Sequence, residues 1–239
     1  MRTDTGTALE ARKRPRQARS RATVDAIFDG TIQVLRVGGL QRLTTIRVAE
    51  RAGVSIGTLY QYFPQKQALL FAALERHLER VVKAIEDAAA SAHHRSLSSM
   101  VEAIVAAFVA AKIERLDESR ALYAVALEFD VRDYVQDVEA RIRRALEIML
   151  LTASDADFDD IETISLMLMG ALVGPTRMVL EAASPHALAG ELRTQLQSLC
   201  LGYLERQARR KGAGDRPPGQ GCHRPVSEPA SVANRFRNS

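Results

Sequence analysis

The chain has 239 residues, 46% of them hydrophobic and 5% aromatic, with no tryptophan and two cysteines. A chain of this length can bury a core without disulfides, and cysteines as differently placed as Cys200 and Cys222 do not indicate a disulfide framework. The net charge of +4 is uneven, because residues 1–21 and residues 209–239 each carry seven basic side chains against two acidic ones. This excludes a uniformly basic surface and indicates a localised basic arm that could attract a polyanion.

The first 21 residues are basic and lack the apolar core of a secretory signal. The longest apolar run, Ile164 to Pro175, is shorter than the roughly 20 residues that cross a membrane, and Arg177 follows it. The cysteine usage suits a reducing compartment. We therefore expect a soluble, cytoplasmic protein without a membrane partner.

Apolar residues recur at steps of three and four through almost the whole chain, and no sustained alternation predicts a strand. A first helix has its apolar face at these steps and ends near Gly38 and Gly39. That face carries Val24, Ile27, Phe28, Thr31 and Leu35.

Two short helices follow, joined at Gly53, which gives the backbone freedom of a tight turn. Thr44 is placed to cap the first of them, and Ser55 is placed to cap the second. The second runs from Ile56 to about Tyr62, and Pro64 ends it because its ring clashes with a continuing helix.

A long helix of about 25 residues, roughly 37 Å, then follows and could join two domains. We predict four or five more helices after it. The segment from Phe158 to about Ala183 is apolar nearly all round, as expected of a helix buried on more than one side. Past Lys211 the chain is rich in Gly, Pro and Ser and is predicted to be disordered.

The helix pair around Gly53 has the pattern of a helix-turn-helix, whose second helix presents its outward N-terminal side chains to a DNA major groove. Helical phase places Leu59 and Phe63 on the inner face of that helix. The other faces carry Ile56, Gly57, Tyr60 and Gln61. A glycine-turned helix pair is also typical of plain packing with its tyrosine in the core, and the basic arm upstream is what favours DNA binding.

Residues from about Ala22 to Leu70, preceded by the basic "RQARSR", resemble the DNA-binding domain of the TetR family of bacterial transcriptional regulators. The most specific part is "AGVSIGTLYQYFPQK", which ends at Lys66 and matches the family pattern AGVSxGTLYxYFPxK. The resemblance covers about a fifth of the chain, and the remainder fits the family in architecture only.

The helical spacing and the resemblance together imply an all-α fold. A three-helix helix-turn-helix domain would be joined by a long helix to a larger helical domain for effector binding and dimerisation. The expected divisions are a disordered basic arm at 1–21, the helix-turn-helix domain at 22–68, the ligand-binding and dimerisation domain at 69–211, and a disordered tail at 212–239.

The resemblance also implies DNA contacts by position. The groove-facing start of the recognition helix carries Ser55, Ile56, Gly57 and Tyr60. The positions that usually contact phosphate carry Thr44, Thr45, Thr58, Tyr62 and Lys66. Hydroxyls and lysine are natural phosphate donors, whereas isoleucine and tyrosine suit thymine methyls and sugars. Gln61 is a further candidate, and Arg19 and Arg21 of the basic arm are predicted to reach an adjacent minor groove.

Arg47 departs from the family, many members of which have an acidic residue at the third position of this helix. An arginine cannot complete a capping box with the start of the helix, and its positive charge interacts unfavourably with the helix dipole by a few tenths of a kcal/mol. A nearby phosphate would make the interaction of this charge favourable. We therefore predict that Arg47 contacts DNA.

The resemblance implies a homodimer built mainly from the last two long helices. Gly170 and Gly174 would let a partner helix approach closely, but Pro175 could equally mark a kink. An effector pocket is expected between helices whose apolar side chains favour a hydrophobic or amphipathic ligand, although such side chains are also typical of plain core. The candidates are Phe108, Tyr123, Phe129, Tyr134, Met149, Met169 and, for the polar end of a ligand, Arg177.

No catalytic, metal or cofactor motif appears, since the chain lacks GxSxG, CxxC, HExxH and a phosphate-binding glycine loop. His93 and His94 have no third ligand at metal-binding spacing. We therefore expect no enzyme, metal or cofactor, and interpret the chain as a homodimeric repressor released from a palindromic operator by an effector. It would act in the bacterial cytoplasm at the nucleoid. An activator, or a DNA-binding protein without an effector, stays open as an alternative.

Overall fold

A computed structural model of the chain describes residues 18–210. Within this range the chain is all-α, with nine α-helices, one short 3-10 helix and a pair of two-residue strands. The elements are α1 (Ala18–Gly38), η1 (Leu40–Arg42), α2 (Thr45–Ala52), α3 (Ile56–Tyr62), α4 (Lys66–Ser91), α5 (Leu97–Ile113), α6 (Leu116–Glu128), α7 (Arg132–Leu150), β1 (Ala156–Asp157), α8 (Ile161–Glu181), α9 (Pro185–Gln207) and β2 (Arg209–Arg210).

The first helix starts earlier than expected. α1 begins at Ala18, because arginine and alanine are good helix formers and Ser20 is held by a 2.8 Å hydrogen bond between its hydroxyl and that of Tyr62. The expectation of disorder is therefore wrong for residues 18–21. The expectations for residues 1–17, for the tail at 212–239 and for Cys222 fall outside the described residues.

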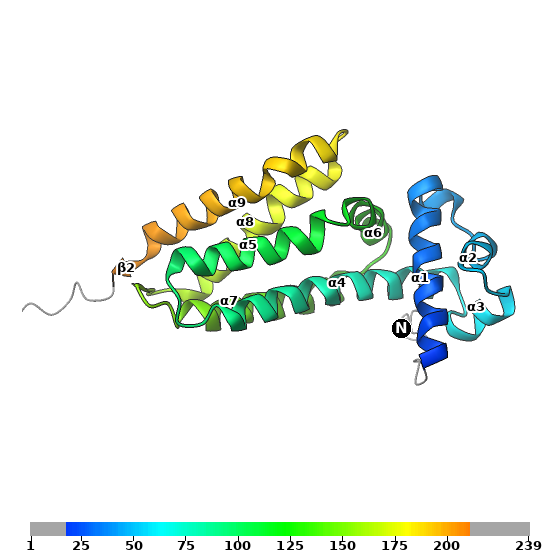
Figure 1. The fold of residues 1–239 in the computed structure, drawn as a ribbon, viewed down its shortest axis with the longest axis horizontal. Helices are drawn as coiled ribbons and strands as arrows, with labels where there is room; N and C mark the ends of the chain where they lie inside the picture. The colour runs from blue at the N-terminus through cyan, green and yellow to red at the C-terminus, as the bar shows by residue number, and fades with distance from the viewer. Residues whose placement is uncertain (1–17, 211–239) are drawn as a thin grey trace, which may run out of the picture.

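Helices α1 to α3 form one end of the molecule, and α4 leads away from them (Figure 1). Their inner faces make one apolar cluster with the first half of α4, as the helical spacing predicts. Each of the four helices contributes a fully buried side chain to this cluster. These side chains are Ile27, Val48, Leu59 and Leu70, all 0% exposed.

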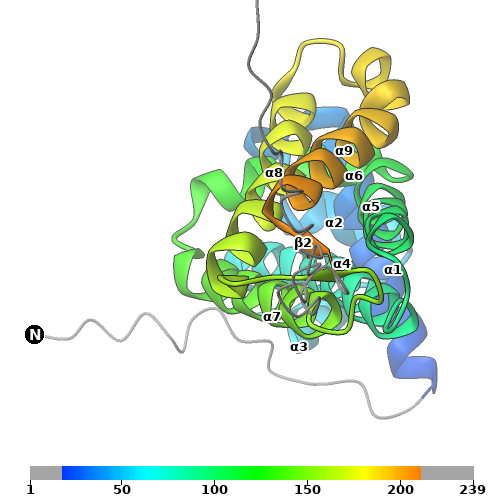
Figure 2. The ribbon, with the colours of Figure 1, turned by 90° about the vertical axis from the view of Figure 1, so that its left-hand side faces the viewer.

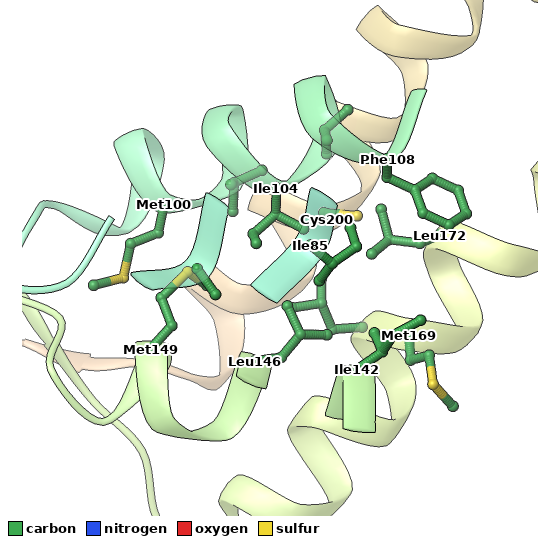
Figure 3. Close-up of a cluster of buried hydrophobic side chains, with 14 of the residues drawn as sticks. Ile85, Met100, Ile104, Phe108, Ile142, Leu146, Met149, Met169, Leu172 and Cys200 are labelled. Atoms are coloured by element: carbon green, nitrogen blue, oxygen red, sulfur yellow. The ribbon is translucent and has the colours of Figure 1, made fainter. Parts of the chain in front are cut away.

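The second half of α4 belongs to a different apolar cluster, shared with α5, α7, α8 and α9. Figure 2 looks along the molecule from the end formed by these helices. Figure 3 shows side chains of all five converging, among them Ile85 of α4, Leu146 of α7, Leu172 of α8 and Cys200 of α9. Burial raises the pKa of the Cys200 thiol to about 11, so this cysteine is a small, protonated core residue at neutral pH.

α6 connects the two parts of the molecule. It is seen end-on beside α1 in Figure 1. Its buried residues Leu122 and Val125 pack in the cluster formed by α1 to α4, not in the C-terminal cluster. A movement of α6 would therefore disturb the packing of α1 and α4 directly.

Two local features complete the C-terminal part: a strand pair that the sequence pattern did not predict, and the continuation of α8 past Pro175, where the sequence left a kink open. β1 pairs antiparallel with β2, and this ties the loop after α7 to the end of α9. α8 continues through Pro175, and Thr176 donates a 2.8 Å hydrogen bond to the carbonyl oxygen of Leu172 inside the buried face of the helix.

Candidate nucleic-acid interface and ligand sites

The turn between α2 and α3 forms as the sequence predicts. Thr44 caps α2, its hydroxyl accepting the Arg47 amide at 3.3 Å, and Ser55 caps α3, its hydroxyl accepting the Thr58 amide at 3.0 Å. Gly53 has φ of 66° and ψ of 30°, a left-handed conformation that favours glycine. These three residues fix where α3 starts and which way it points.

Helical phase separates the inner and outer side chains of α3 as predicted. Leu59 is 0% exposed, whereas Ile56 and Tyr60 are 39% and 44% exposed. Gly57 and Gln61 are also exposed. The start of α3 therefore presents an apolar side chain, an aromatic ring and a bare backbone to the outside, the features that suit close contact with a DNA groove.

The hydroxyl-bearing candidates lie around this surface. Thr44 and Ser55 are exposed, Thr45 and Thr58 are half-buried, and the Thr58 hydroxyl lies 2.8 Å from that of Ser55. Lys66 is the first residue of α4 and is half-buried. The N-termini of α2, α3 and α4 thus each bring a polar side chain, as expected of a set of phosphate donors.

Tyr62 is largely buried. Its ring is only 8% exposed and packs at 6.4 Å from the ring of Phe63. Its hydroxyl is paired with Ser20 of α1. This side chain therefore fastens α3 to α1, which the periodicity alone did not indicate. The contact of Tyr62 with phosphate stays a prediction.

The arginine candidates are helical or tethered. Arg21 is exposed on α1 rather than in an extended arm, and Arg19 lies on the same helix. The Arg47 guanidinium is exposed and donates to the backbone carbonyl of Arg42 at 3.0 Å. Arg47 thus fastens η1 to α2 in the free protein, and its contact with DNA stays a prediction.

The seven expected pocket residues do not surround one cavity. Phe108, Met149 and Met169 are buried in the C-terminal cluster (Figure 3). Phe129 packs with the cluster of α1 to α4 instead. The remaining three lie at helix surfaces and are Tyr123, Tyr134 and Arg177.

These three have polar partners of their own. The Tyr123 hydroxyl donates to Glu181 at 2.6 Å, and Arg177 donates to the same carboxylate at 2.9 Å. Tyr134 donates to the carbonyl oxygen of Glu75 at 3.4 Å, and burial together with that glutamate raises its pKa to about 12. They are parts of surface hydrogen-bond clusters.

The space between the C-terminal helices is closed. The void lined by Met149, Leu172 and Cys200 measures about 10 Å³, the room of about one water molecule. This void has no room for an effector, and the effector pocket lined by the seven residues stays a prediction. Spacing predicts which side chains point inward, but close packing decides whether they leave room for a ligand.

Sequence reasoning missed a polar cluster around the first turn of α6. Asp117 pairs with Arg36 of α1 and lies 3.6 Å from the His186 ring of α9. Glu118 accepts hydrogen bonds from Arg80 of α4 at 2.5 Å and from Arg115 at 3.3 Å. Two adjacent carboxylates thus bind α6 to three other helices. An acidic pair in the first turn of a helix was the signal available in the sequence.

His77 of α4 lies beside this cluster and is 2% exposed. Its Nδ1 is 2.9 Å from the Arg80 guanidinium, and its Nε2 has no hydrogen-bond partner among the described residues. Burial lowers the pKa of His77, and the charges of Lys112 and Arg80 lower it further against the opposing effect of Glu118. The ring is therefore a neutral imidazole at pH 7.

Two family comparisons match most of the described chain. Residues 27–73 match the family described as "Bacterial regulatory proteins, tetR family". Residues 96–204 match the family described as "Tetracyclin repressor-like, C-terminal domain". The first match covers the helix-turn-helix end, and the second covers the C-terminal helices.

Curated relatives match only a short part of the chain. The transcriptional repressor KstR of Mycolicibacterium smegmatis is 47% identical over 55 residues, which are 23% of this chain and 27% of the relative. The nucleoid occlusion factor SlmA of Haemophilus ducreyi is 53% identical over 38 residues, 16% of this chain and 19% of the relative. The chain thus aligns with about a quarter or less of the length of these relatives.

Solved structures share the fold over most of the chain. A regulator from Mesorhizobium loti, 16% identical, covers 81% of this chain and 100% of its own, with a TM-score of 0.60. The regulator FadR of Bacillus subtilis in complex with stearoyl-CoA, 13% identical, covers 75% of this chain and 98% of its own, with a TM-score of 0.61. At these identities the likeness extends to the fold alone.

Proposed function

This chain belongs to the TetR family of bacterial transcriptional regulators, and we propose that it is a homodimeric repressor. The repressor binds a roughly palindromic DNA operator, and a small hydrophobic or amphipathic effector releases it. The observation that carries DNA binding is the exposed start of α3, where Ile56 and Tyr60 stand out from a helix whose first turn is capped by the side chain of Ser55.

In this proposal α3 lies in the major groove with Ser55, Ile56, Gly57 and Tyr60 toward the bases. Thr44, Thr45, Thr58 and Lys66 contact the phosphates on either side, because they stand at the N-termini of three helices. Gln61, Arg21, Arg19 and Arg47 add contacts at the edge of this surface. Tyr62 supports the reading helix from inside.

The dimer rests on an apolar stripe along α8. Within residues 18–210, α8 is the one helix long and apolar enough to span a membrane, yet less than half of its most apolar stretch is buried in the monomer. Leu166, Met167, Val173 and Met178 are 38 to 71% exposed, at the spacing of one helix face. Gly170 lies on the same face with open space around it.

α9 extends this surface. Leu188 and Leu199 are 52% and 48% exposed and stand eleven residues apart, about three helical turns, so they share a face. Exposed apolar stripes on two adjacent helices are typical of a surface that a partner covers. A second copy of the chain would bury both stripes in a four-helix contact and set the two α3 helices about 34 to 36 Å apart.

Release by an effector is supported by the position of α6, whose buried side chains pack against the helix-turn-helix end. The bound stearoyl-CoA of the FadR structure is an amphipathic ligand of one protein with this fold. Binding would favour the conformation for which the ligand has the higher affinity, and a shift of α6 and α4 would then move the two α3 helices out of register with the operator.

A DNA-binding protein without an effector is the second candidate. The match to the nucleoid occlusion factor SlmA over 38 residues and the small void of the C-terminal core favour it. An activator would use the same DNA surface, so operator position relative to a promoter separates it from a repressor.

The test is selection of bound fragments from bacterial genomic DNA by the full chain, followed by footprinting of the enriched site. We expect one protected palindromic window that overlaps a promoter. Binding without preference for a palindrome would contradict the repressor and favour the effector-free candidate.

Dimerisation is tested separately by sedimentation of Met167→Glu and of the control Leu127→Glu. Both leucine-sized side chains are exposed, at 53% and 68%, but Leu127 belongs to α6 and not to the apolar stripes of α8 and α9. The Met167 variant should be monomeric and should lose cooperative operator binding, while the Leu127 variant stays dimeric. A dimeric Met167 variant would place the interface elsewhere.

A further inference from the structure

A ligand-sized cavity lies between the two parts of the molecule. It measures about 750 Å³ and is bounded by α1, η1 and the end of α2 on one side and by α6 on the other. We name it the interdomain cleft. Its apolar wall is formed by Leu35, Val37, Leu40, Ala121 and Ala124. Pockets for small organic ligands commonly have volumes of about 300 to 1,000 Å³, so this cleft has room for one, whereas the 10 Å³ void of the C-terminal core does not.

The rest of the cleft wall is cationic. It carries the guanidinium groups of Arg36, Arg51 and Arg120 and the carboxylate of Asp117. Asp117 pairs with Arg36, whereas the side chains of Arg51 and Arg120 are exposed and make no side-chain hydrogen bond or ion pair with another residue of the described range 18–210. Three positive groups against one negative group leave an attraction for an anion at the mouth of the cleft.

The neighbouring cavity along the first turn of α6 is not cationic. It measures about 390 Å³ and shares Arg36 and Asp117 with the cleft, and its other charged lining residues are Arg115, Glu114 and Glu118. Behind it, burial lowers the pKa of Lys112 to about 8, and the charge of Arg80 acts in the same direction. His77 is held neutral there with an unpartnered Nε2. Arg80 of this cluster is already paired with the carboxylate of Glu118, so the attraction for an anion rests on Arg51 and Arg120 of the interdomain cleft.

We propose that the interdomain cleft binds an anionic amphipathic small molecule. Its charged group lies between Arg51 of α2 and Arg120 of α6, and its apolar part lies against Leu35, Leu40 and the alanines of α6. Charge-assisted hydrogen bonds from two guanidinium groups provide the specificity for an anion, and the apolar wall excludes a bare inorganic ion as the preferred ligand.

The site also suggests how occupancy reaches the DNA surface, a consequence that rests on the proposed repressor function. Arg51 and Arg36 belong to the helix-turn-helix end, whereas Arg120 and Asp117 belong to α6. The ion pair between Arg36 and Asp117 fastens α1 to α6, and a bound anion competes with Asp117 for Arg36. Occupancy therefore changes how α1 to α3 are held against the C-terminal helices.

The test titrates the full chain, without DNA, with n-octyl phosphate below its micelle concentration, by isothermal titration calorimetry. 1-Octanol and inorganic phosphate are titrated in parallel. The cleft variant is Arg51→Gln with Arg120→Gln, and the control is Arg95→Gln with Arg144→Gln, which removes two exposed arginines outside the cleft. Thermal unfolding of each variant checks that it is folded.

We expect octyl phosphate to bind the wild-type chain and the control equally, and to bind the cleft variant at least tenfold more weakly. Octanol and inorganic phosphate should each bind the wild type at least tenfold more weakly than octyl phosphate. Absence of octyl phosphate binding, equal binding to the cleft variant, or octanol or inorganic phosphate binding as tight as octyl phosphate would overturn the site.

Operator affinity is then measured by fluorescence anisotropy with and without saturating octyl phosphate. A change of at least tenfold that the cleft variant lacks would support the regulatory consequence. An unchanged affinity would overturn that consequence while leaving the binding site in place. Failure to bind any operator would refute the proposed repressor but would not affect the titration, which contains no DNA. The two proposals can therefore fail separately.

Discussion

The hydroxyl oxygens of Thr45 and Tyr60 lie 3.0 Å apart, so the first turn of α2 and the exposed face of α3 are joined by a side-chain hydrogen bond. Tyr60 is the outward aromatic residue of the recognition helix, and its ring direction is therefore fixed from the neighbouring helix. Thr45 thus has a positioning role in addition to its predicted contact with phosphate. An ordered tyrosine loses less conformational entropy when it meets DNA than a free one.

Replacement of Tyr60 should affect DNA binding without affecting the fold. Tyr60→Phe keeps the ring but loses the bond to Thr45, and we expect operator affinity to fall about three- to tenfold, the range of one net hydrogen bond. Tyr60→Ala should cost more than Tyr60→Phe, with an unchanged unfolding midpoint because the side chain is exposed. Anisotropy titrations measure both, and equal affinity of all three proteins would exclude Tyr60 from the interface.

Leu59→Ala should give the opposite result. The side chain is fully buried, and its truncation leaves a cavity beneath the recognition helix. We expect a loss of about 2 to 5 kcal/mol in the free energy of unfolding, measured by urea denaturation. The exposed neighbour Gln61→Ala is the control and should change stability by less than about 0.5 kcal/mol. Similar small losses in both would mean that the faces of α3 are assigned wrongly.

Arg47→Ala separates a structural arginine from a DNA-contacting one. The guanidinium holds the Arg42 carbonyl in the free protein. If it also meets a phosphate, the variant should bind the operator more weakly at low salt, and the slope of log affinity against log salt should fall by about 1. A purely structural arginine would instead lower the unfolding midpoint and leave that slope unchanged.

Glu118 should make the protein sensitive to acid. Burial would raise the pKa of this carboxyl, but His77 and the hydrogen-bonded Arg80 outweigh it and lower the pKa to about 2. As the pH falls, the Glu118 carboxyl is protonated in the unfolded chain before it is protonated in the folded chain. The contribution of Glu118 to the free energy of unfolding, which is present above pH 4.5, is therefore lost as the pH falls toward 2.

Glu118→Gln should accordingly unfold about 3 kcal/mol more easily at pH 7, and its stability should vary less than that of the wild type between pH 4.5 and 2. Denaturation curves across this range measure the difference. The exposed carboxylate Glu102 on α5 supplies the control, since Glu102→Gln should follow the wild-type pH profile. A Glu118 variant that also follows it would disprove the coupling.

Lys112 should destabilise the folded chain at neutral pH. Its pKa of about 8 lies below the ordinary 10.5, so folding disfavours its charge, and stability should rise as the pH increases from 8 to 10.5. Lys112→Met keeps a flexible chain of similar length without the charge. We expect it to stabilise the protein by about 1 to 3 kcal/mol at pH 7 and to remove this rise. A destabilised variant would show that the ammonium group has a favourable partner.

The caps and the helical phase of the DNA-binding end were determined by the sequence alone. Thr44, Gly53 and Ser55 act within three or four residues of their own positions, so their roles depend on local geometry that the sequence specifies. The inward direction of Leu59 and the outward direction of Tyr60 follow from a period of 3.6 residues. The all-α fold, the family and the exposed start of α3 are consequences of such short-range rules.

Tyr62, the ligand space and the role of α6 were decided only by tertiary structure. Tyr62 turned inward because Ser20, 42 residues away, supplies a partner for its hydroxyl. The residues expected to line an effector pocket are divided between two apolar clusters and the surface, and no spacing along one helix records how tightly another helix packs against it. Asp117 meets Arg36 across 81 residues, and the cleft beside them exists only because α6 comes to rest against α1. Contacts of this range depend on how whole helices are placed in space, which the periodicity of a sequence does not contain.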